Sequence, residues 1–149
     1  MNQKDHKLKI FTDGACKGNP GPGGWGVLII SENSRKELKG YENPTTNNKM
    51  ELKAVIEGLK TLDTPSTIEL TTDSKYVKNG ITSWIINWKK NNWMTAKKKP
   101  VKNKELWMTL EELTEDHNII WKWVRSHSGH LENERADNLA NEAILENIT

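Results

Sequence analysis

The spacing of apolar residues changes near Thr46, and this change restricts the possible folds more than any other feature of the sequence. Before it, short β-type runs alternate with turns rich in glycine and proline, which predicts strands at residues 8–13, 25–30 and 37–41. After it, apolar residues recur with the period of a helix. The stripe consists of Leu52, Val55, Ile56, Leu59 and Leu62, and either Thr45 or Thr46 could cap this helix.

The remainder of the chain alternates strand and helix patterns. We expect strands at 67–73 and 119–124, and helices at 74–80, 81–90, 103–115 and 132–146. A polar, lysine-rich piece at 94–101 is expected to be a loop. Strands separated by helices imply right-handed crossovers and a partly parallel sheet, so the sequence predicts a mixed α/β fold. The length of 149 residues suits one domain covering 1–149.

Composition excludes several classes of protein. No run approaches the roughly 20 apolar residues of a membrane span, and the polar N-terminus does not resemble a secretory signal. The single cysteine, Cys16, excludes an intramolecular disulfide and a zinc cluster built on cysteines. We therefore expect a cytoplasmic protein without membrane contact.

Positive charge is concentrated in one segment. The chain has a net charge of only +2, but seven lysines and a single acid, Glu105, lie between Trp84 and Trp107. A local cationic patch on a mildly acidic body is typical of a phosphate-binding surface, because screening leaves nearby charge dominant.

Four carboxylates are candidates for one site. Asp13 and Asp73 close two predicted strands, and ligands of open α/β sheets lie beyond such strand ends. Glu51 lies one turn into the first helix and Asp137 about one turn into the last. Oxygen donors favour a hard cation such as magnesium. With two such ions, one can activate a water molecule while the other stabilises the departing oxygen of a phosphodiester. A lone aspartate at a strand end is more often a turn or helix cap, so spacing alone leaves both interpretations open.

Several runs of adjacent residues include or accompany these carboxylates. They are Phe11-Thr12-Asp13-Gly14, Gly18-Asn19-Pro20-Gly21-Pro22-Gly23-Gly24, Thr45-Thr46-Asn47-Asn48-Lys49-Met50-Glu51-Leu52, Thr72-Asp73-Ser74, Asn87-Trp88-Lys89-Lys90, Lys99-Pro100-Val101-Lys102-Asn103 and Glu132-Asn133-Glu134-Arg135-Ala136-Asp137. Together these motifs resemble bacterial type 1 ribonuclease H. The similarity covers about residues 7 to 145 in the family's order.

The resemblance implies a fold, a reaction and a catalytic set. The fold would be a five-stranded mixed sheet in the order 3-2-1-4-5, flanked by helices and carrying a basic protrusion. The reaction would be hydrolysis of the RNA strand of RNA–DNA hybrids, leaving 5′-phosphate and 3′-hydroxyl ends. Two Mg²⁺ ions, with Mn²⁺ as a possible substitute, would be bound by the family's catalytic carboxylates, which match Asp13, Glu51, Asp73 and Asp137. His127 matches a loop histidine that helps proton transfer or product departure, whereas His130 is expected to be structural.

The resemblance also implies substrate contacts by a monomer. Small polar groups that read 2′-hydroxyls in the minor groove match Cys16, Asn19, Asn47 and Asn48. Thr46 and Asn103 match a pocket for a phosphate of the DNA strand. The basic protrusion would hold that strand through Trp84, Lys89 and Lys90. Trp88, Trp93 and Trp107 are expected to form the protrusion's own core.

Three departures from the family pattern affect these expectations. Ser126 replaces a glycine before the loop histidine, Lys75 replaces a common glutamine, and residues 41–44 lack the arginine expected in the phosphate pocket. Two other functions remain open. One is a module that binds hybrids without cleaving them, and the other is an integrase or transposase acting on DNA. Intact carboxylates disfavour the first, and the asparagine set with the basic segment disfavours the second.

Overall fold

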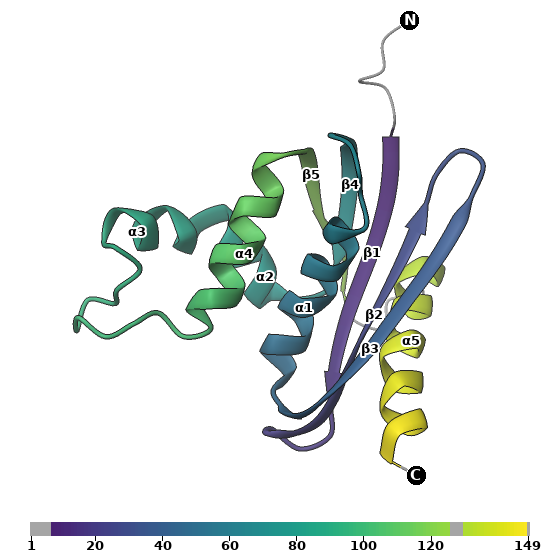
Figure 1. Cartoon of the computed structure of the whole chain (residues 1–149), viewed down its shortest axis with the longest axis horizontal. Coiled ribbons are helices and arrows are strands. Elements are labelled where there is room, and N and C mark those ends of the chain that lie inside the picture. The colour runs from purple at the N-terminus through teal and green to yellow at the C-terminus, as the bar shows by residue number, and fades with distance from the viewer. Residues whose placement is uncertain (1–6, 126–129, 149) are drawn as a thin grey trace, which may run out of the picture.

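A five-stranded mixed sheet forms the centre of the molecule (Figure 1). The structure is a computed structural model that describes residues 7–125 and 130–148. Its strands are β1 (Lys7–Cys16), β2 (Gly21–Ile30), β3 (Arg35–Thr45), β4 (Thr67–Thr72) and β5 (Asn118–Trp123). β2 is antiparallel to β1 and β3, whereas β4 is parallel to β1 and β5. The sheet order β3-β2-β1-β4-β5 confirms the predicted fold.

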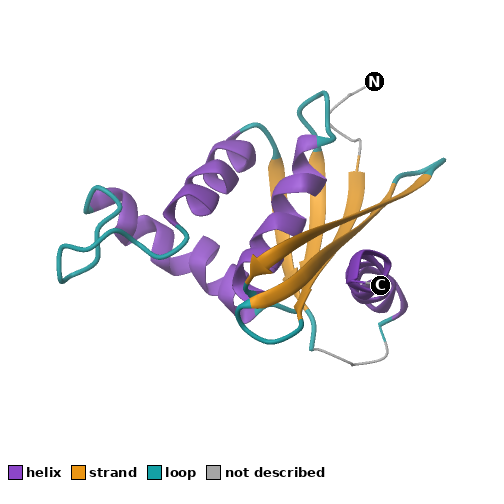
Figure 2. Ribbon diagram, turned by 60° about the horizontal axis from the view of Figure 1, so that its bottom comes forward, coloured by secondary structure: helices purple, strands orange, loops and turns teal. Residues whose placement is uncertain are grey.

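Helices cover both faces of this sheet (Figure 2). α1 (Asn47–Lys60) and α4 (Lys104–Glu115) lie on one face, and α5 (Leu131–Ile148) packs on β1, β2 and β3 from the other. Two short helices, α2 (Lys75–Asn79) and α3 (Ile85–Lys90), are joined by a π-helical turn, η2 (Gly80–Trp84). Within 7–125 and 130–148, no helix has the length and apolar character to cross a membrane.

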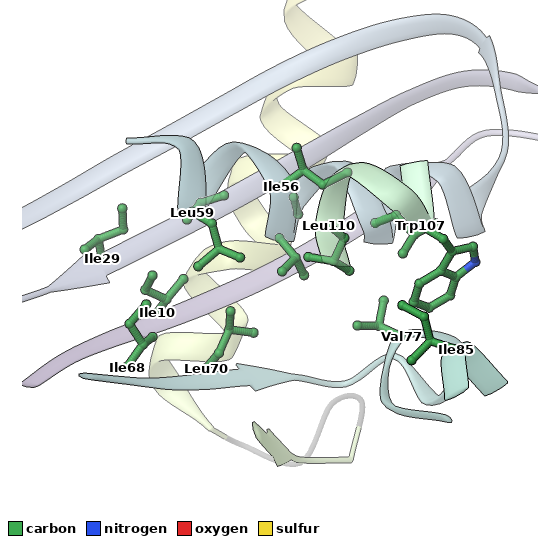
Figure 3. Packing of buried hydrophobic residues seen from close by; sticks show 14 of the residues in the cluster. Ile10, Ile29, Ile56, Leu59, Ile68, Leu70, Val77, Ile85, Trp107 and Leu110 are labelled. Atoms are coloured by element: carbon green, nitrogen blue, oxygen red, sulfur yellow. The ribbon is translucent and has the colours of Figure 1, made fainter. Parts of the chain in front are cut away.

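The main core lies between α1, α4 and the sheet (Figure 3). Leu59 of α1 and Leu110 of α4 are fully buried with the strand residues Ile10 and Leu70. Burying an aliphatic side chain of this size contributes about 1.5–3 kcal/mol. The predicted helical stripe is confirmed through Leu59.

The first helix ends earlier than its apolar stripe predicts. α1 stops at Lys60, and Leu62 packs against the core from beyond the helix. The Thr61 hydroxyl donates to the Gly58 carbonyl oxygen at 2.8 Å, and the Thr61 N–H turns back to the same carbonyl. These local bonds satisfy the end of the helix. At the other end Thr46 is the cap, since its hydroxyl oxygen accepts a hydrogen bond from the Lys49 N–H.

Residues 14–24, between the first two expected strands, are rich in glycine and proline and are expected to form a turn, but most of them lie in strands. β1 extends to Cys16 and β2 begins at Gly21, with Ala15 opposite Gly24 in the antiparallel register. Small residues are required here because helices approach both faces closely. A Cβ at Gly14 would collide with the backbone of α1 at Glu51. Gly14 therefore allows α1, and Gly24 allows α5, to come into van der Waals contact with the sheet.

α3 and the segment that follows it stand away from the sheet (Figures 1 and 2). The ring of Trp88 lies 6.2 Å from that of Trp93 and 5.4 Å from that of Trp107. Trp107 is fully buried, and the lack of a side chain at Gly80 leaves room for its indole ring. The three rings pack on one another as predicted, but they do not form a separate core, because Trp107 belongs to the main core and Trp88 and Trp93 pack against it.

Candidate active site

Parallel pairing of β1 with β4 brings two aspartates together. Thr12 pairs with Thr72, so Asp13 and Asp73 are the next residues along two adjacent strands. Asp73 follows the end of β4 as predicted. Asp13 does not close its strand, because β1 continues for three residues along its antiparallel partner β2. The prediction of a strand end at Asp13 is therefore wrong, although the predicted meeting of Asp13 with Asp73 is confirmed.

Glu51 completes a compact group of three carboxylates. It is only 6% exposed and reaches the sheet from α1, which Gly14 allows to approach β1. Asp13, Glu51 and Asp73 each offer a carboxylate oxygen, and these oxygens all lie within 4.8 Å of one another. Hard divalent cations in proteins take oxygen ligands of this kind.

Asp137 joins the group from α5. Asp137 lines the same hollow, and it contributes to the raised pKa of Asp13. Asn141, one turn further along the helix, donates from Nδ2 to the Asp137 carboxylate at 3.2 Å and to its carbonyl oxygen at 2.9 Å. Sequence reasoning missed Asn141, although its spacing of four residues from Asp137 places both side chains on one helix face.

The electrostatics of the group favour either bound protons or a bound cation. Burial raises the pKa of Asp13 to about 11, and the negative charges of Glu51 and Asp73 contribute further. Burial, followed by the charge of Asp73, raises the pKa of Glu51 as well. Among the described residues, Glu51 Oε1 is buried and has no hydrogen-bond partner. Crowded carboxylates with an unpartnered buried oxygen fit a divalent cation, which would allow them to ionise together.

The carboxylates lie in an open hollow of about 500 Å³ whose wall is mainly polar. Three predicted substrate residues line it, Cys16, Asn47 and Asn48. Asn19 is adjacent, because its Oδ1 accepts a hydrogen bond from the Asn47 N–H at 3.0 Å. The structure therefore brings the predicted minor-groove set to the rim of the carboxylate group.

The two residues of the predicted phosphate pocket begin two different helices. Thr46 caps α1, and Asn103 precedes α4 with a left-handed backbone, φ 60°. Asn103 Nδ2 donates to the Tyr76 hydroxyl at 3.1 Å, and Tyr76 itself lines the hollow. A phosphate contact at either residue stays a prediction.

The predicted contacts of the basic segment differ in their availability. Trp84 is 37% exposed, with its inner side packed on Tyr76 and Trp88. Lys90 is exposed, whereas Lys89 Nζ lies 2.7 Å from a carboxylate oxygen of Glu111 on α4. Lys89 therefore ties α3 to α4 within the protein itself.

Two histidines follow β5, and one of them can be placed. His127 and Ser126 lie outside the described residues. His130 Nδ1 accepts a hydrogen bond from the Asn133 N–H at 3.3 Å, and its ring lies 5.5 Å from that of Phe11. These contacts agree with the predicted structural role of His130 at the start of α5.

Residues 5–145 match the family described as RNase H. A ribonuclease H of Hydrogenovibrio crunogenus is 62% identical over 140 residues, which are 94% of this chain and 97% of that protein. A ribonuclease H of Rhodopseudomonas palustris is 56% identical over 148 residues, covering 99% and 96%. Both similarities extend through all four carboxylates.

Solved structures show the same architecture. LC9-RNase H1, described as a type 1 RNase H with the type 2 active-site motif, superposes with a TM-score of 0.88 at 31% identity, covering 98% of this chain and 75% of that one. LC11-RNase H1 in complex with RNA/DNA hybrid has a TM-score of 0.68 at 26% identity, covering 95% and 99%.

Proposed function

Because the chain belongs to the ribonuclease H family, we propose that it hydrolyses the RNA strand of RNA–DNA hybrids in a metal-dependent reaction. The observation that carries this proposal is the meeting of Asp13, Glu51 and Asp73 oxygens within 4.8 Å of one another. The complex of the similar LC11-RNase H1 with an RNA/DNA hybrid supports the substrate class.

The four carboxylates would hold Mg²⁺, and we propose two ions, for which Mn²⁺ could substitute. When bound, such ions stabilise negative charge on the phosphodiester and promote ionisation of the attacking water. Asp13, Glu51 and Asp73 supply the shared oxygens, and Asp137 extends the set from α5. Asn141 holds the Asp137 carboxylate in position through its Nδ2 donor. The products of this reaction would carry 5′-phosphate and 3′-hydroxyl ends.

Recognition of RNA would fall to the polar rim of the hollow. The side chains of Asn47 and Asn48 lie beside the carboxylates, where they can meet the 2′-hydroxyls of the strand that is cut. The Cys16 thiol donates to the Thr45 carbonyl oxygen at 3.4 Å, and Cys16 also lines the hollow beside Asn47. Asn19 supports Asn47 from the preceding turn.

The DNA strand would lie against the segment that projects from the sheet. Lysines there would contact phosphates without sequence preference. Lys90 is exposed and can make such a contact. The exposed side of Trp84 would pack on a deoxyribose. We also propose that Thr46 and Asn103 contact a DNA phosphate, and that His127 assists proton transfer or product departure.

We further propose a single-domain monomer acting in the cytoplasm. The free thiol of Cys16 agrees with a reducing compartment.

Cleavage of an end-labelled hybrid, with duplex DNA and duplex RNA beside it, tests the proposed function. Cutting of the RNA strand in Mg²⁺, abolished by chelation, is the expected result. Binding of the hybrid without cleavage would favour a non-catalytic module. Preferential cutting of duplex DNA would favour an integrase-like reaction.

A further inference from the structure

Two lysines share the ring of one tryptophan beside the carboxylate group. Lys75 Nζ lies 5.7 Å from the centroid of the Trp123 ring, and Lys78 Nζ lies 5.2 Å from it. Both distances are within the range in which an ammonium is attracted to an aromatic face. Lys75 and Lys78 are three residues apart in α2, so their side chains project from one side of the helix.

This arrangement is fixed to the carboxylate site. The Trp123 Nε1–H donates to the backbone carbonyl oxygen of Asp73 at 3.1 Å, which holds the ring next to a residue of the metal-binding group. Lys75 is two residues from Asp73 and lines the hollow that contains the carboxylates. Two residues span at most about 7 Å of chain, so Lys75 lies beside the carboxylate group.

Both ammonium groups remain available to a ligand. Lys75 and Lys78 are exposed, and Trp123 is half-buried. Among residues 7–125 and 130–148, the ion pairs with carboxylates include neither of them, in contrast to Lys39, Lys53, Lys60, Lys89 and Lys122. A tryptophan face orients a lysine without neutralising its charge, whereas a carboxylate partner would neutralise it.

We propose that Lys75 and Lys78, oriented by Trp123, bind backbone phosphates of the RNA strand next to the bond that is cut. The inference rests on the proposed function. If the RNA strand is the one cut at the carboxylates, then the RNA strand is also the one that passes Lys75 in the same hollow. A nucleic-acid strand carries a charge at every nucleotide, so the phosphates beside the scissile one come within reach of the pair. The pair would also offset repulsion between these phosphates and the four carboxylates.

The salt dependence of binding tests the charge contacts. Affinity for a short hybrid is measured by fluorescence anisotropy in EDTA, over a series of salt concentrations, for Lys75→Gln, Lys78→Gln and the double variant. Each substitution should make the log–log slope shallower by about one, and the double variant by about two. Lys36→Gln is the matched control, since it removes an exposed lysine of β3 remote from the hollow and should leave the slope unchanged.

Uncharged linkages in the substrate identify the strand. A single methylphosphonate is moved along each strand of a hybrid that the unaltered chain cuts at one main position in Mg²⁺. At one or two RNA linkages beside that position, a methylphosphonate should lower the affinity of the unaltered chain several-fold. The same substitutions should leave the affinity of the double lysine variant unchanged. Equal losses in both proteins at every RNA linkage, or an unchanged salt slope, would overturn the inference while hybrid cleavage persists. Failure of the unaltered chain to cut any hybrid would instead overturn the proposed function.

Discussion

Asp13 and Asp73 are sixty residues apart in sequence, yet parallel pairing of β1 and β4 makes them neighbours whose carboxylate oxygens lie within 4.8 Å of each other. Glu51 lies within the same distance of both. Like charges at this separation in a buried site oppose one another. The arrangement is therefore unfavourable for the isolated fold and suited to binding divalent cations.

Replacing either aspartate should separate activity from stability. Asp13→Asn and Asp73→Asn each remove one negatively charged carboxylate from the group. The rate of hybrid cleavage should therefore fall by roughly a thousandfold or more, as it does when catalytic residues that act together lose one member. The same changes relieve repulsion, and the melting temperature in EDTA should stay equal or rise. Single-turnover cleavage and calorimetry measure the two effects. Near-normal cleavage by either variant would contradict the assigned role.

The pH dependence of stability should report the raised pKa of Asp13. With a pKa near 11 in place of 3.8, the folded chain keeps a proton that the unfolded chain releases above about pH 4. The metal-free protein should therefore lose stability as pH rises from about 5 to 8, by up to about 4 kcal/mol relative to Asp13→Asn. Thermal melts in EDTA measure this difference, which Mg²⁺ should reduce. Parallel melting curves for the two proteins across this range would contradict the prediction.

Asn141→Ala should impair catalysis without affecting binding. The Asp137 carboxylate would lose its Nδ2 donor, and loss of such a supporting hydrogen bond typically costs about 10–100-fold in metal affinity or activity. Asn147→Ala is the matched control, because Asn147 makes a similar bond to the Ala143 carbonyl oxygen further along α5. Hybrid affinity in EDTA should be the same for both variants. Equal cleavage rates would show that Asn141 has no positioning role.

The ion pair between Lys89 and Glu111 should prevent Lys89 from contacting a phosphate of the hybrid. Glu111→Gln frees the Lys89 ammonium, so hybrid affinity at moderate salt should increase by roughly two- to fivefold. Lys90→Gln should weaken binding by a similar factor, because Lys90 is exposed. Lys89→Gln should change affinity little. An unaltered affinity of Glu111→Gln in an anisotropy titration would refute the masking.

The order of strands and helices along the chain could be predicted because their periods are local patterns. The sheet order and the catalytic set were predicted from the resemblance of the motifs around Asp13, Glu51 and Asp73 to the family. The extension of β1 to Cys16 could not be predicted in this way. Its glycines look like turn residues in sequence, and only the approach of α1 and α5 shows why they lie in strands.

Interactions between distant side chains also escaped the sequence. Nothing local to Lys89 indicates that it pairs with Glu111 of α4, because the pairing depends on where α3 and α4 lie in the folded chain. The position of Lys75 over the Trp123 ring requires α2 to pack at the end of β5. Such contacts follow from the tertiary structure and decide which cations are available to substrate.

Cation binding by the gathered carboxylates is tested most directly by anomalous diffraction from crystals soaked in Mn²⁺. We expect a peak about 2 Å from oxygens of Asp13, Glu51 and Asp73, a typical distance for a small divalent ion, and its loss in Asp13→Asn crystals. A second peak beside Asp137 would support the two-ion proposal. Crystals that show no peak among these oxygens at saturating Mn²⁺, while the same protein cleaves hybrid, would contradict the central claim.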